Sequence, residues 1–459
     1  MTGLLATTVN TFSGFGMPYK LSFIGEFIKI LIEGFGSIGV GIIIFTLILK
    51  LITLPLDIYS RVSTKKMALK QEAMKEDLEK LQRQYANNKD LYNQKMQALY
   101  KKQGVSMLSS CLPMIVTIIF FIVVINQFTE YSNYTNLSMI NNMTNAYNEQ
   151  IVNYNELNGS DDLIVSGTEE KVVTVNYDSV YEKTDLATYD IEMTKNADGS
   201  FTFFAGDVNK LGQLIEKYKL QGFDENGKIV DGRIKKDGDN YVIDTDKIAE
   251  GGEEGVVKAI SAAVADFAFN SYVEENVLNK ARAAAAKVYR EQAPSFLWVK
   301  NLWVPDLPWR HPVFAKFSDY NFGKIKQNDK ELSELVFSEI THDLGDEKNA
   351  PNGYLILVVL SIGIMLLSQL IMQKSQKTQM QLGTVDGQGA QTSKMMMWMM
   401  PVMFGVFAFI YNASFSIYMI VSSAFSTLST VIINKIVENN FKKKAEEEAA
   451  VNDKRFFKK

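Results

Sequence analysis

The sequence predicts an all-α polytopic membrane protein: a five-helix transmembrane core with a polar groove, a cytoplasmic helical hairpin and an inserted extracellular α+β domain. Two observations lead to this fold class. Long apolar segments alternate with strongly charged ones, and basic and acidic segments alternate along the 459 residues. A transmembrane helix needs about 20 mainly apolar residues. Five segments meet that requirement or come close to it: 37–57, 107–128, 352–374, 395–411 and 413–436.

The charges between these segments predict their orientation, because cytoplasmic loops carry an excess of Lys and Arg. Residues 58–105 contain 11 Lys/Arg and 5 Asp/Glu, whereas residues 129–351 contain 23 Lys/Arg and 38 Asp/Glu. We therefore expect 58–105, the loop 375–394 and the basic tail 437–459 to be cytoplasmic. The N-terminus and the acidic insert 129–351 are expected outside, in a multi-pass protein of the bacterial cell membrane.

Residues 1–36 are expected to form an extracellular N-terminus with an amphipathic helix on the membrane surface, over 18–33. Polar residues recur there at spacings of 4, 3 and 4, and they leave an apolar face opposite. The polar residues are Ser22, Glu26, Lys29 and Glu33. Gly34 and Gly36 then permit a sharp turn into the first span. No cleavable signal peptide is apparent in the first 16 residues.

Two segments outside the spans have structure of their own. Residues 58–105 show apolar residues at a and d spacing with a break near Asn87-Asn88, which predicts a helical hairpin. The hairpin is either a plain connector with a solvated basic face or a docking surface for lipid, ribosome or nascent chain. Within 129–351, alternating segments such as 171–177 and 200–204 predict strands, and helices are expected over 137–157 and 256–292.

Polar residues inside the spans are the most informative for function. Lys50 lies near the middle of the first span, where a lysine costs about 2.5–3.5 kcal/mol on insertion scales. Polar residues at helical spacing on the same and other spans predict a hydrated groove: Thr46, Thr53, Asp57, Thr117, Ser368, Gln369, Ser423 and Thr427. Two alternatives remain: the hydroxyls could serve helix packing, and Lys50 could extend to the membrane surface.

Such a groove suits conduction of a solute or the passage of a peptide's polar flank into the bilayer. The sequence contains no catalytic or nucleotide-binding motif, so we expect no enzyme. A Ser–Lys pair that uses Lys50 is formally possible. Cys111 is expected to be a buried structural thiol, and His311 and His342 lack partners for a zinc site. We expect no metal and no cofactor.

Several motifs together resemble those of the YidC/Oxa/Alb family of membrane protein insertases. They are the first span with its exit, Gly39 to Leu56, the hairpin close Leu99 to Gly104, and the entry Ser110 to Pro113. The segments Phe296 to Asp306, Met399 to Met403 and Phe415 to Ser422 complete the set. The match covers roughly 18–128, 290–310 and 350–440. The missing extra N-terminal span suggests the type found in single-membrane bacteria, and the enlarged extracellular insert departs from the family core.

The resemblance implies five core helices around a groove that opens to the cytoplasm and to lipid, with Lys50 in place of the usual groove arginine. It implies nascent membrane proteins as clients, and as partners the ribosome, possibly the Sec translocon and signal-recognition targeting machinery, and anionic lipids, with no small-molecule substrate. The expected ribosome or lipid contacts are Arg61, Lys65, Lys66, Lys442, Lys443, Lys444, Lys458 and Lys459. The alternatives are a small-solute transporter or channel, and a membrane-tethered outer binding module.

Overall fold

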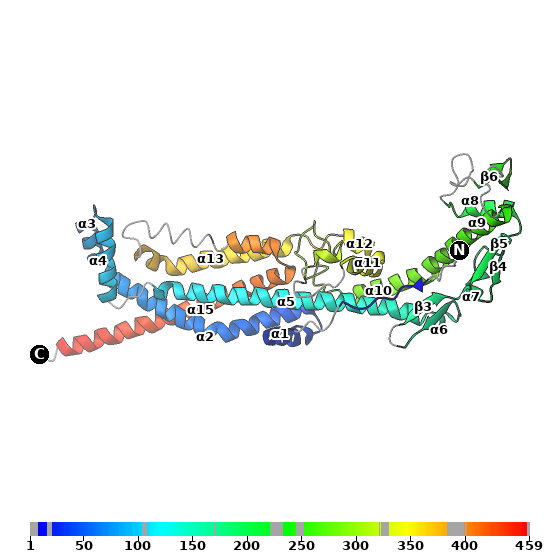
Figure 1. The fold of residues 1–459 in the computed structure, drawn as a ribbon. Coiled ribbons are helices and arrows are strands. Elements are labelled where there is room, and N and C mark those ends of the chain that lie inside the picture. Colours follow the sequence, from blue (N-terminus) through cyan, green and yellow to red (C-terminus); the bar gives the residue numbers. More distant parts are fainter. Residues whose placement is uncertain are drawn as a thin grey trace.

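The computed structural model describes residues 8–15, 21–102, 108–168, 171–220, 233–244, 252–320, 322, 330–382, 399 and 402–456. The molecule is elongated and mainly helical, with a bundle of long helices at one end and a mixed helical and stranded unit at the other (Figure 1). We call the bundle the core and the mixed unit the insert unit. We call the end of the core near the helical hairpin the hairpin end, and the end near the insert unit the insert end.

The core contains the following elements, in chain order: α1 (Phe23–Glu33), α2 (Ile38–Ala73), the first part of α5 (Leu108–Val152), α13 (Ile356–Leu382), a helical segment over 402–410, and α15 (Ala413–Phe456). Helix α15 packs along both α2 and α13, and it follows the 402–410 segment after a turn at Tyr411-Asn412. This turn makes a tight hairpin of the 402–410 segment and α15.

Helix α1 packs on α2 and α5, with Gly25, Ile28 and Ile32 buried. Ser22 caps the helix by accepting from the Gly25 amide at 3.1 Å, and the Ser22 amide donates to Glu130 at 2.9 Å. Lys29 donates to the Tyr134 hydroxyl at 2.7 Å. The polar stripe of α1 is thus partly satisfied by α5, while large apolar side chains of α1 such as Phe23 stay exposed. Gly36, at φ 67°, makes the turn toward α2.

Helix α5 joins the core to the insert unit without a break. Its 45 residues correspond to a length of about 67 Å, more than twice the roughly 30 Å of a bilayer's hydrocarbon layer. The apolar stretch ends near Phe128, and the distal half carries repeated asparagines. The sequence indicated a span and a separate helix over 137–157; in the structure they are one helix, which runs along most of the molecule (Figure 1).

The insert unit is built on the distal half of α5 and on the helical column α9 (Gly252–Val273), the π-helical turn η2 (Glu274–Leu278) and α10 (Asn279–Gln292). Helices α5 and α10 pack side by side. The remaining elements are α6 (Tyr154–Asn158), α7 (Tyr177–Tyr181), α8 (Val208–Lys217), α11 (Lys330–Ile340) and α12 (Gly345–Asn349), with the short 3-10 turns η3 (Phe317–Asp319) and η4 (His342–Leu344).

The strands of this unit form three small antiparallel sheets. The first has the order β1 (Thr8–Val9), β3 (Val172–Val175), β2 (Leu163–Ser166). The others are the pairs β4 (Ile191–Lys195) with β5 (Phe201–Ala205), and β6 (Ile234–Asp237) with β7 (Asn240–Ile243). Thr8 faces Thr174 and Val9 faces Val173, so the N-terminal segment is part of the insert unit. A continuous apolar cluster unites these elements, with Phe269 of α9 and Leu137 of α5 fully packed.

Residues 58–102 form the rest of the hairpin end. Helix α2 continues past its apolar part to Ala73, and α3 (Lys75–Gln84) and α4 (Lys89–Lys102) follow, with a turn over 85–88. Met74, Leu78 and Tyr100 form the small apolar contact between them. The first hairpin helix is therefore largely an extension of α2, because no helix-breaking residue separates the span from the basic stretch except Pro55, which α2 includes.

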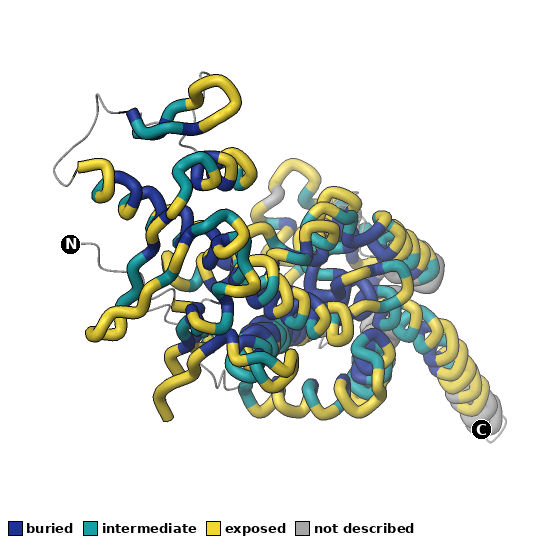
Figure 2. Tube along the Cα trace, turned by 90° about the vertical axis from the view of Figure 1, so that its right-hand side faces the viewer, coloured by how far each residue is buried: buried dark blue, intermediate teal, exposed yellow. Residues whose placement is uncertain are grey.

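Exposed apolar surface on the core indicates a lipid environment. Large apolar side chains such as Ile52, Val359 and Leu428 are 64%, 64% and 63% exposed on α2, α13 and α15. Soluble monomers rarely expose contiguous patches of this kind. Viewed along the bundle, buried residues gather between the helices and exposed ones lie around the outside (Figure 2).

Three helices of the described chain are long and apolar enough to cross a membrane: Ile38–Ser63, Gly252–Gln292 and Ala413–Lys443. A shorter apolar helix spans Ile356–Ile371. The Gly252–Gln292 column differs from the other two because 50% of its apolar window is buried, against 28% and 33%. Its apolar side is covered by the insert unit, so it is an interior helix there. The fourth predicted span, 395–411, lies partly outside the described residues.

Candidate functional site in the helical core

The insert end of the core is closed by aromatic packing. The Phe121 ring of α5 meets Phe404 at 4.5 Å and Phe415 of α15 at 5.6 Å, edge to face in both contacts. Phe45 of α2 packs edge to face on Phe128 at 5.6 Å. Residues 413–419 of α15 are all buried. Aromatic side chains thus fill the interior of this part of the bundle.

The hairpin end of the core is packed less tightly. Along α2, residues 41–46 are mostly buried, but none of residues 47–60 is. Along α15, continuous burial ends at Met419, after which buried and partly exposed positions alternate. The two helices still touch there, since the Arg61 side chain donates to the Thr430 hydroxyl. The core is thus closed at its insert end and more open toward its hairpin end.

Three charged residues of α2 share one face in this open half. Lys50, Asp57 and Arg61 are separated by 7 and 4 residues, which brings all three within about 40° of one another around the helix. The Arg61 contact with Thr430 shows that this face is turned toward α15. Asp57 lies within electrostatic range of both Lys50 and Arg61. Neither cation has a carboxylate within 4 Å among the described residues, so this face has a net positive charge.

The predicted hydroxyl residues divide into two groups. Thr46 is fully buried in the closed half and donates to the Ile42 carbonyl at 2.7 Å, which is helix packing. Thr53 and Thr427 lie in the open half and are partly exposed. They also donate within their own helices, to Lys50 O at 3.2 Å and Ser423 O at 2.7 Å. Both hydroxyl oxygens keep a lone pair for a water or a peptide amide.

The remaining predicted residues are placed as follows. Ser423 and Gln369 are partly exposed, and Ser368 is buried on α13. Lys66, Lys442 and Lys443 are exposed, on α2 and α15. The side chains of Thr117, Lys65 and Lys444, and the whole of Lys458 and Lys459, lie outside the described residues. Arg61 differs from the other predicted surface cations because its guanidinium contacts α15.

A buried network of polar hydrogen bonds stabilises the insert end of α13. It was not predicted from the sequence. Asp306 is 1% exposed and accepts from the backbone amides of Tyr354 at 2.8 Å and Leu357 at 2.6 Å. Asn352 donates to the carbonyls of Asn301, Val304 and Pro305 at 3.0–3.1 Å. The segment Phe296 to Asp306 thus acts as a cap on the first turn of α13. The signal available in the sequence was the Pro-Asp pair 50 residues before an apolar helix.

A cavity of about 380 Å³ lies where the core meets the insert unit. Its walls come from α1, α5, α10, α11 and the segment 294–313, and include Lys29, Glu33, Tyr131 and Trp303. Lys29 is bonded to Tyr134, and Tyr131 donates to Glu33 at 3.3 Å. Burial and the neighbouring Glu33 carboxylate raise the pKa of the Tyr131 hydroxyl well above its usual range. Ile38 at the start of α2 also lines the cavity, 12 residues before Lys50, which is not among the lining residues.

Comparison with known proteins agrees with this architecture. The family model described as "60Kd inner membrane protein" matches residues 30–187 and 276–440, which is more than half of the chain. The match includes the core helices and omits 188–275, the part of the insert unit that runs from β4 to the start of η2. No solved structure matches the chain.

Several relatives carry the name membrane protein insertase YidC. The protein of Fusobacterium nucleatum is 34% identical over 104 residues, which cover 22% of this chain and 49% of the relative. YidC 1 of Streptococcus pyogenes serotype M3 is 41% identical over 85 residues, 18% of this chain and 30% of the relative. The Treponema denticola protein is 29% identical over 130 residues, 28% and 21% of the two chains.

The chain spans about half or less of the length of these relatives. The family match and the apolar helices nevertheless establish a multi-pass bacterial membrane protein. The chain belongs to the 60Kd inner membrane protein family, which includes the YidC insertases.

Proposed function

We propose that the chain is a membrane protein insertase that helps transmembrane segments of nascent proteins to enter and fold in the bacterial cell membrane. Family membership supports this function. The observation that carries it is Lys50, a cation in an apolar helix, on the α2 face turned to α15, with no carboxylate within 4 Å in the part of the chain that the structure describes. Its position at the boundary between a closed and an open half suits a groove that ends inside the membrane.

The physical task of an insertase is to lower the cost of moving a polar flank into hydrocarbon. An acidic residue at the centre of a membrane helix costs about 2.5–3.5 kcal/mol on insertion scales. A hydrated groove with a net positive charge offsets part of this cost while the flank is inside. The neighbouring apolar faces of α2 and α15 then offer a path for the client's apolar segment into lipid, since Ile52 and Leu428 are already exposed. This cycle needs no covalent step, nucleotide, metal or cofactor.

The proposed orientation has the insert unit outside, and the hairpin and the end of α15 in the cytoplasm. The excess of Lys and Arg in residues 58–105 supports it. So does the pairing of β1 with β3, because it keeps the N-terminal segment on the same side as the insert unit. The exposed cations Lys66, Lys442 and Lys443 are then available to ribosomal RNA or anionic lipid, and the Sec translocon and the targeting machinery remain proposed partners.

The first test is rescue of growth in bacteria depleted of their own insertase. Wild-type protein and Lys50→Arg are expected to restore growth, and Lys50→Ala to fail or to restore it weakly at matched expression. Loss of a charge contact worth about 1.4 kcal/mol corresponds to a tenfold drop in insertion of an acidic client. Plating efficiency and insertion of one acidic client are measured together. Equal rescue by all three variants keeps the function and limits Lys50 to particular clients, whereas failure of wild type, with a native client too, refutes the function.

A second candidate, a membrane-tethered binding module, is favoured by one observation: residues 188–275 lie outside the family match. The two candidates are separated by removing the distal insert. Lys280 donates to Asn158 at 2.6 Å, so Gly159 can be joined to Asn279 by a short linker in place of residues 160–278. The shortened protein is expected to rescue growth as the full chain does. Loss of rescue with normal membrane accumulation would favour the binding module.

A further inference from the structure

The structure assigns Arg61 a role that its position in a basic stretch does not indicate. It lies 11 residues after Lys50 on α2, which corresponds to about 16 Å along the helix axis toward the hairpin end. Its guanidinium Nη2 donates to the Thr430 hydroxyl of α15, a residue that is 1% exposed. The side chain is therefore directed into the seam between two core helices. An arginine that simply reached for lipid phosphate would point away from this seam.

The guanidinium has spare hydrogen-bonding capacity. An arginine has five N–H donors in a planar fork. The contact with Thr430 uses one of them, and Nε is buried without an acceptor in the described part of the chain. Thr430 already donates its own hydroxyl proton to the Ser426 carbonyl, so it serves Arg61 as an acceptor. A buried donor without an acceptor is unfavourable, and an incoming acceptor would relieve that cost.

The charge around Arg61 favours a carboxylate as that acceptor. Asp57, one turn away, is the carboxylate in electrostatic range, yet no ion pair forms between the two side chains within 4 Å. With Lys50 further along the same face, the three charges leave an excess of one positive charge. Planar bidentate binding is a property of guanidinium and not of ammonium. Arg61 therefore supplies the fork that a lysine at position 50 lacks.

We propose that Arg61 and Thr430 form a receiving site for the carboxylate of an acidic residue in the polar flank of a client segment, before that residue reaches Lys50. This inference rests on the proposed insertase function. A client carboxylate would then meet two cations one after the other along α2: first the Arg61 guanidinium, which is nearer the hairpin end, and then Lys50. A client whose flank carries Asp or Glu depends on the site, and an otherwise identical client with Asn or Gln does not.

The test measures insertion of two single-span clients that differ only by one flank residue, Asp or Asn. Both are expressed in cells that depend on the full-length chain, and insertion is scored by protease protection. Arg61→Gln is expected to lower insertion of the Asp client about tenfold and of the Asn client less than about twofold. Arg61→Lys keeps the charge without the fork and gives an intermediate loss. Arg310→Gln makes the same chemical change at an exposed position of the insert end and leaves both clients unchanged.

A charge exchange strengthens the test. Arg61→Glu is expected to lose the Asp client and to recover insertion when the client residue is Lys. Equal loss of both clients in Arg61→Gln would overturn the proposal and leave Arg61 as a packing contact between α2 and α15. Loss of both clients that grows with the anionic lipid content would assign Arg61 to a lipid headgroup instead. If wild-type protein inserts neither client, the insertase function fails together with this site; if it inserts both and Arg61→Gln does not discriminate, only the site fails.

Discussion

Asp306→Ala is expected to lower the free energy of unfolding of the core by about 3–4 kcal/mol, with a matching loss of intact protein from the membrane. The carboxylate is buried and accepts from the amides of Tyr354 and Leu357, at the positively polarised start of α13. Hydrogen bonds to a charged group contribute about 1.5–3 kcal/mol each. Alanine would leave both amides without an acceptor in a buried site.

Asp306→Asn provides the matched comparison, because it keeps the size of the side chain and one acceptor oxygen. It is expected to lose about half as much stability as alanine, since the charge is lost but one amide stays bonded. Thermal unfolding in detergent, followed by tryptophan fluorescence, measures both variants; Trp298 and Trp303 lie in the same segment. Equal stability of wild type and Asp306→Ala would show that the cap on α13 is unimportant.

Gly353 shows how closely this cap is fitted. A Cβ atom at position 353 would lie 1.7 Å from the Asp306 carboxylate oxygen. Only glycine leaves room for the carboxylate to reach the amides at the start of α13. The neighbouring Leu355 adopts φ 66°, in the left-handed region that side chains rarely occupy. The backbone just before α13 is therefore locally strained at the place where the segment Phe296 to Asp306 caps the helix.

Apolar length in the sequence predicted apolar helices that the structure contains: Ile38–Ser63 and Ala413–Lys443 are long enough to cross a membrane, and Ile356–Ile371 is shorter. Two strands were also predicted, since β3 and β5 fall at the alternating segments 171–177 and 200–204. The joint role of Asp306 and Asn352 could not be predicted from the sequence. Their bonds join backbone and side chains about 50 residues apart, and no local pattern encodes such a contact.

The polar residues of the spans illustrate the same limit. Thr46 and Thr53 are equally polar and lie on one face of α2, yet Thr46 is buried in the closed half of the core and Thr53 is partly exposed. Spacing determines the face of a helix, whereas the depth at which neighbouring helices separate depends on packing. Arg61 is the clearest instance. Charge counting assigns it to the basic hairpin, and only the position of α15 reveals its contact with Thr430.

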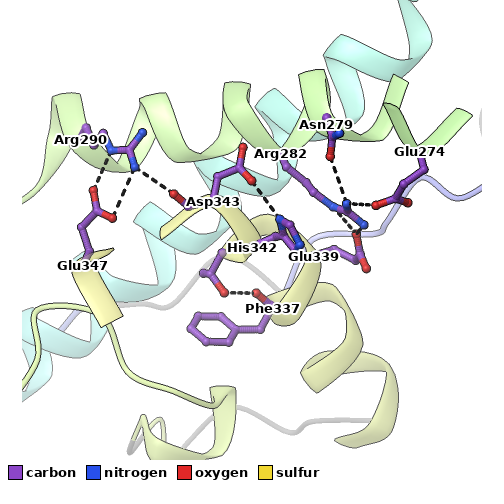
Figure 3. Close-up of polar contacts among 10 residues, drawn as sticks. Glu274, Asn279, Arg282, Arg290, Phe337, Glu339, His342, Asp343 and Glu347 are labelled. Atoms are coloured by element: carbon purple, nitrogen blue, oxygen red, sulfur yellow. Dashed lines mark hydrogen bonds and ion pairs between the residues drawn. The ribbon is translucent and has the colours of Figure 1, made fainter. Parts of the chain in front are cut away.

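The π-helical turn η2 is a further feature that the local sequence does not predict. It joins α9 to α10 and lies beside a buried cation, Arg282, which is 5% exposed. Arg282 binds Glu274 of the turn, and it binds Glu339 of α11 through Nη2 at 2.8 Å and Nε at 3.0 Å (Figure 3). Burial would lower the pKa of Arg282, but the hydrogen bonds to Glu274 and Glu339 raise it above its usual value. One side chain thus fastens α11 to the bend in the helical column.

Arg282→Ala is expected to destabilise the insert unit by about 3–5 kcal/mol, the range found when one partner of a buried ion pair is removed. Arg290 is the matched control, because it lies two turns further on α10 and pairs with Glu347 at 2.7 Å (Figure 3). The Arg290 side chain is 52% exposed, so Arg290→Ala is expected to cost at most about 1 kcal/mol. Limited proteolysis and hydrogen exchange of residues 252–292 measure both changes. Equal effects of the two variants would refute the buried clamp.

The same pair of variants bears on function, because it loosens the insert unit without touching the face of α2 that carries Lys50 and Arg61. If insertion is the task of the core, Arg282→Ala opens the insert unit to protease and still rescues growth as Arg290→Ala does. The loosening could spread to the core through α5, which packs beside α10, or through the cavity at the junction, which Tyr289 of α10 and Phe337 of α11 both line. Rescue lost in Arg282→Ala, with the Asp306 cap and membrane accumulation intact, would mean that the insert unit takes part in insertion. The two cations of α2 would then account for only the cytoplasmic half of the mechanism.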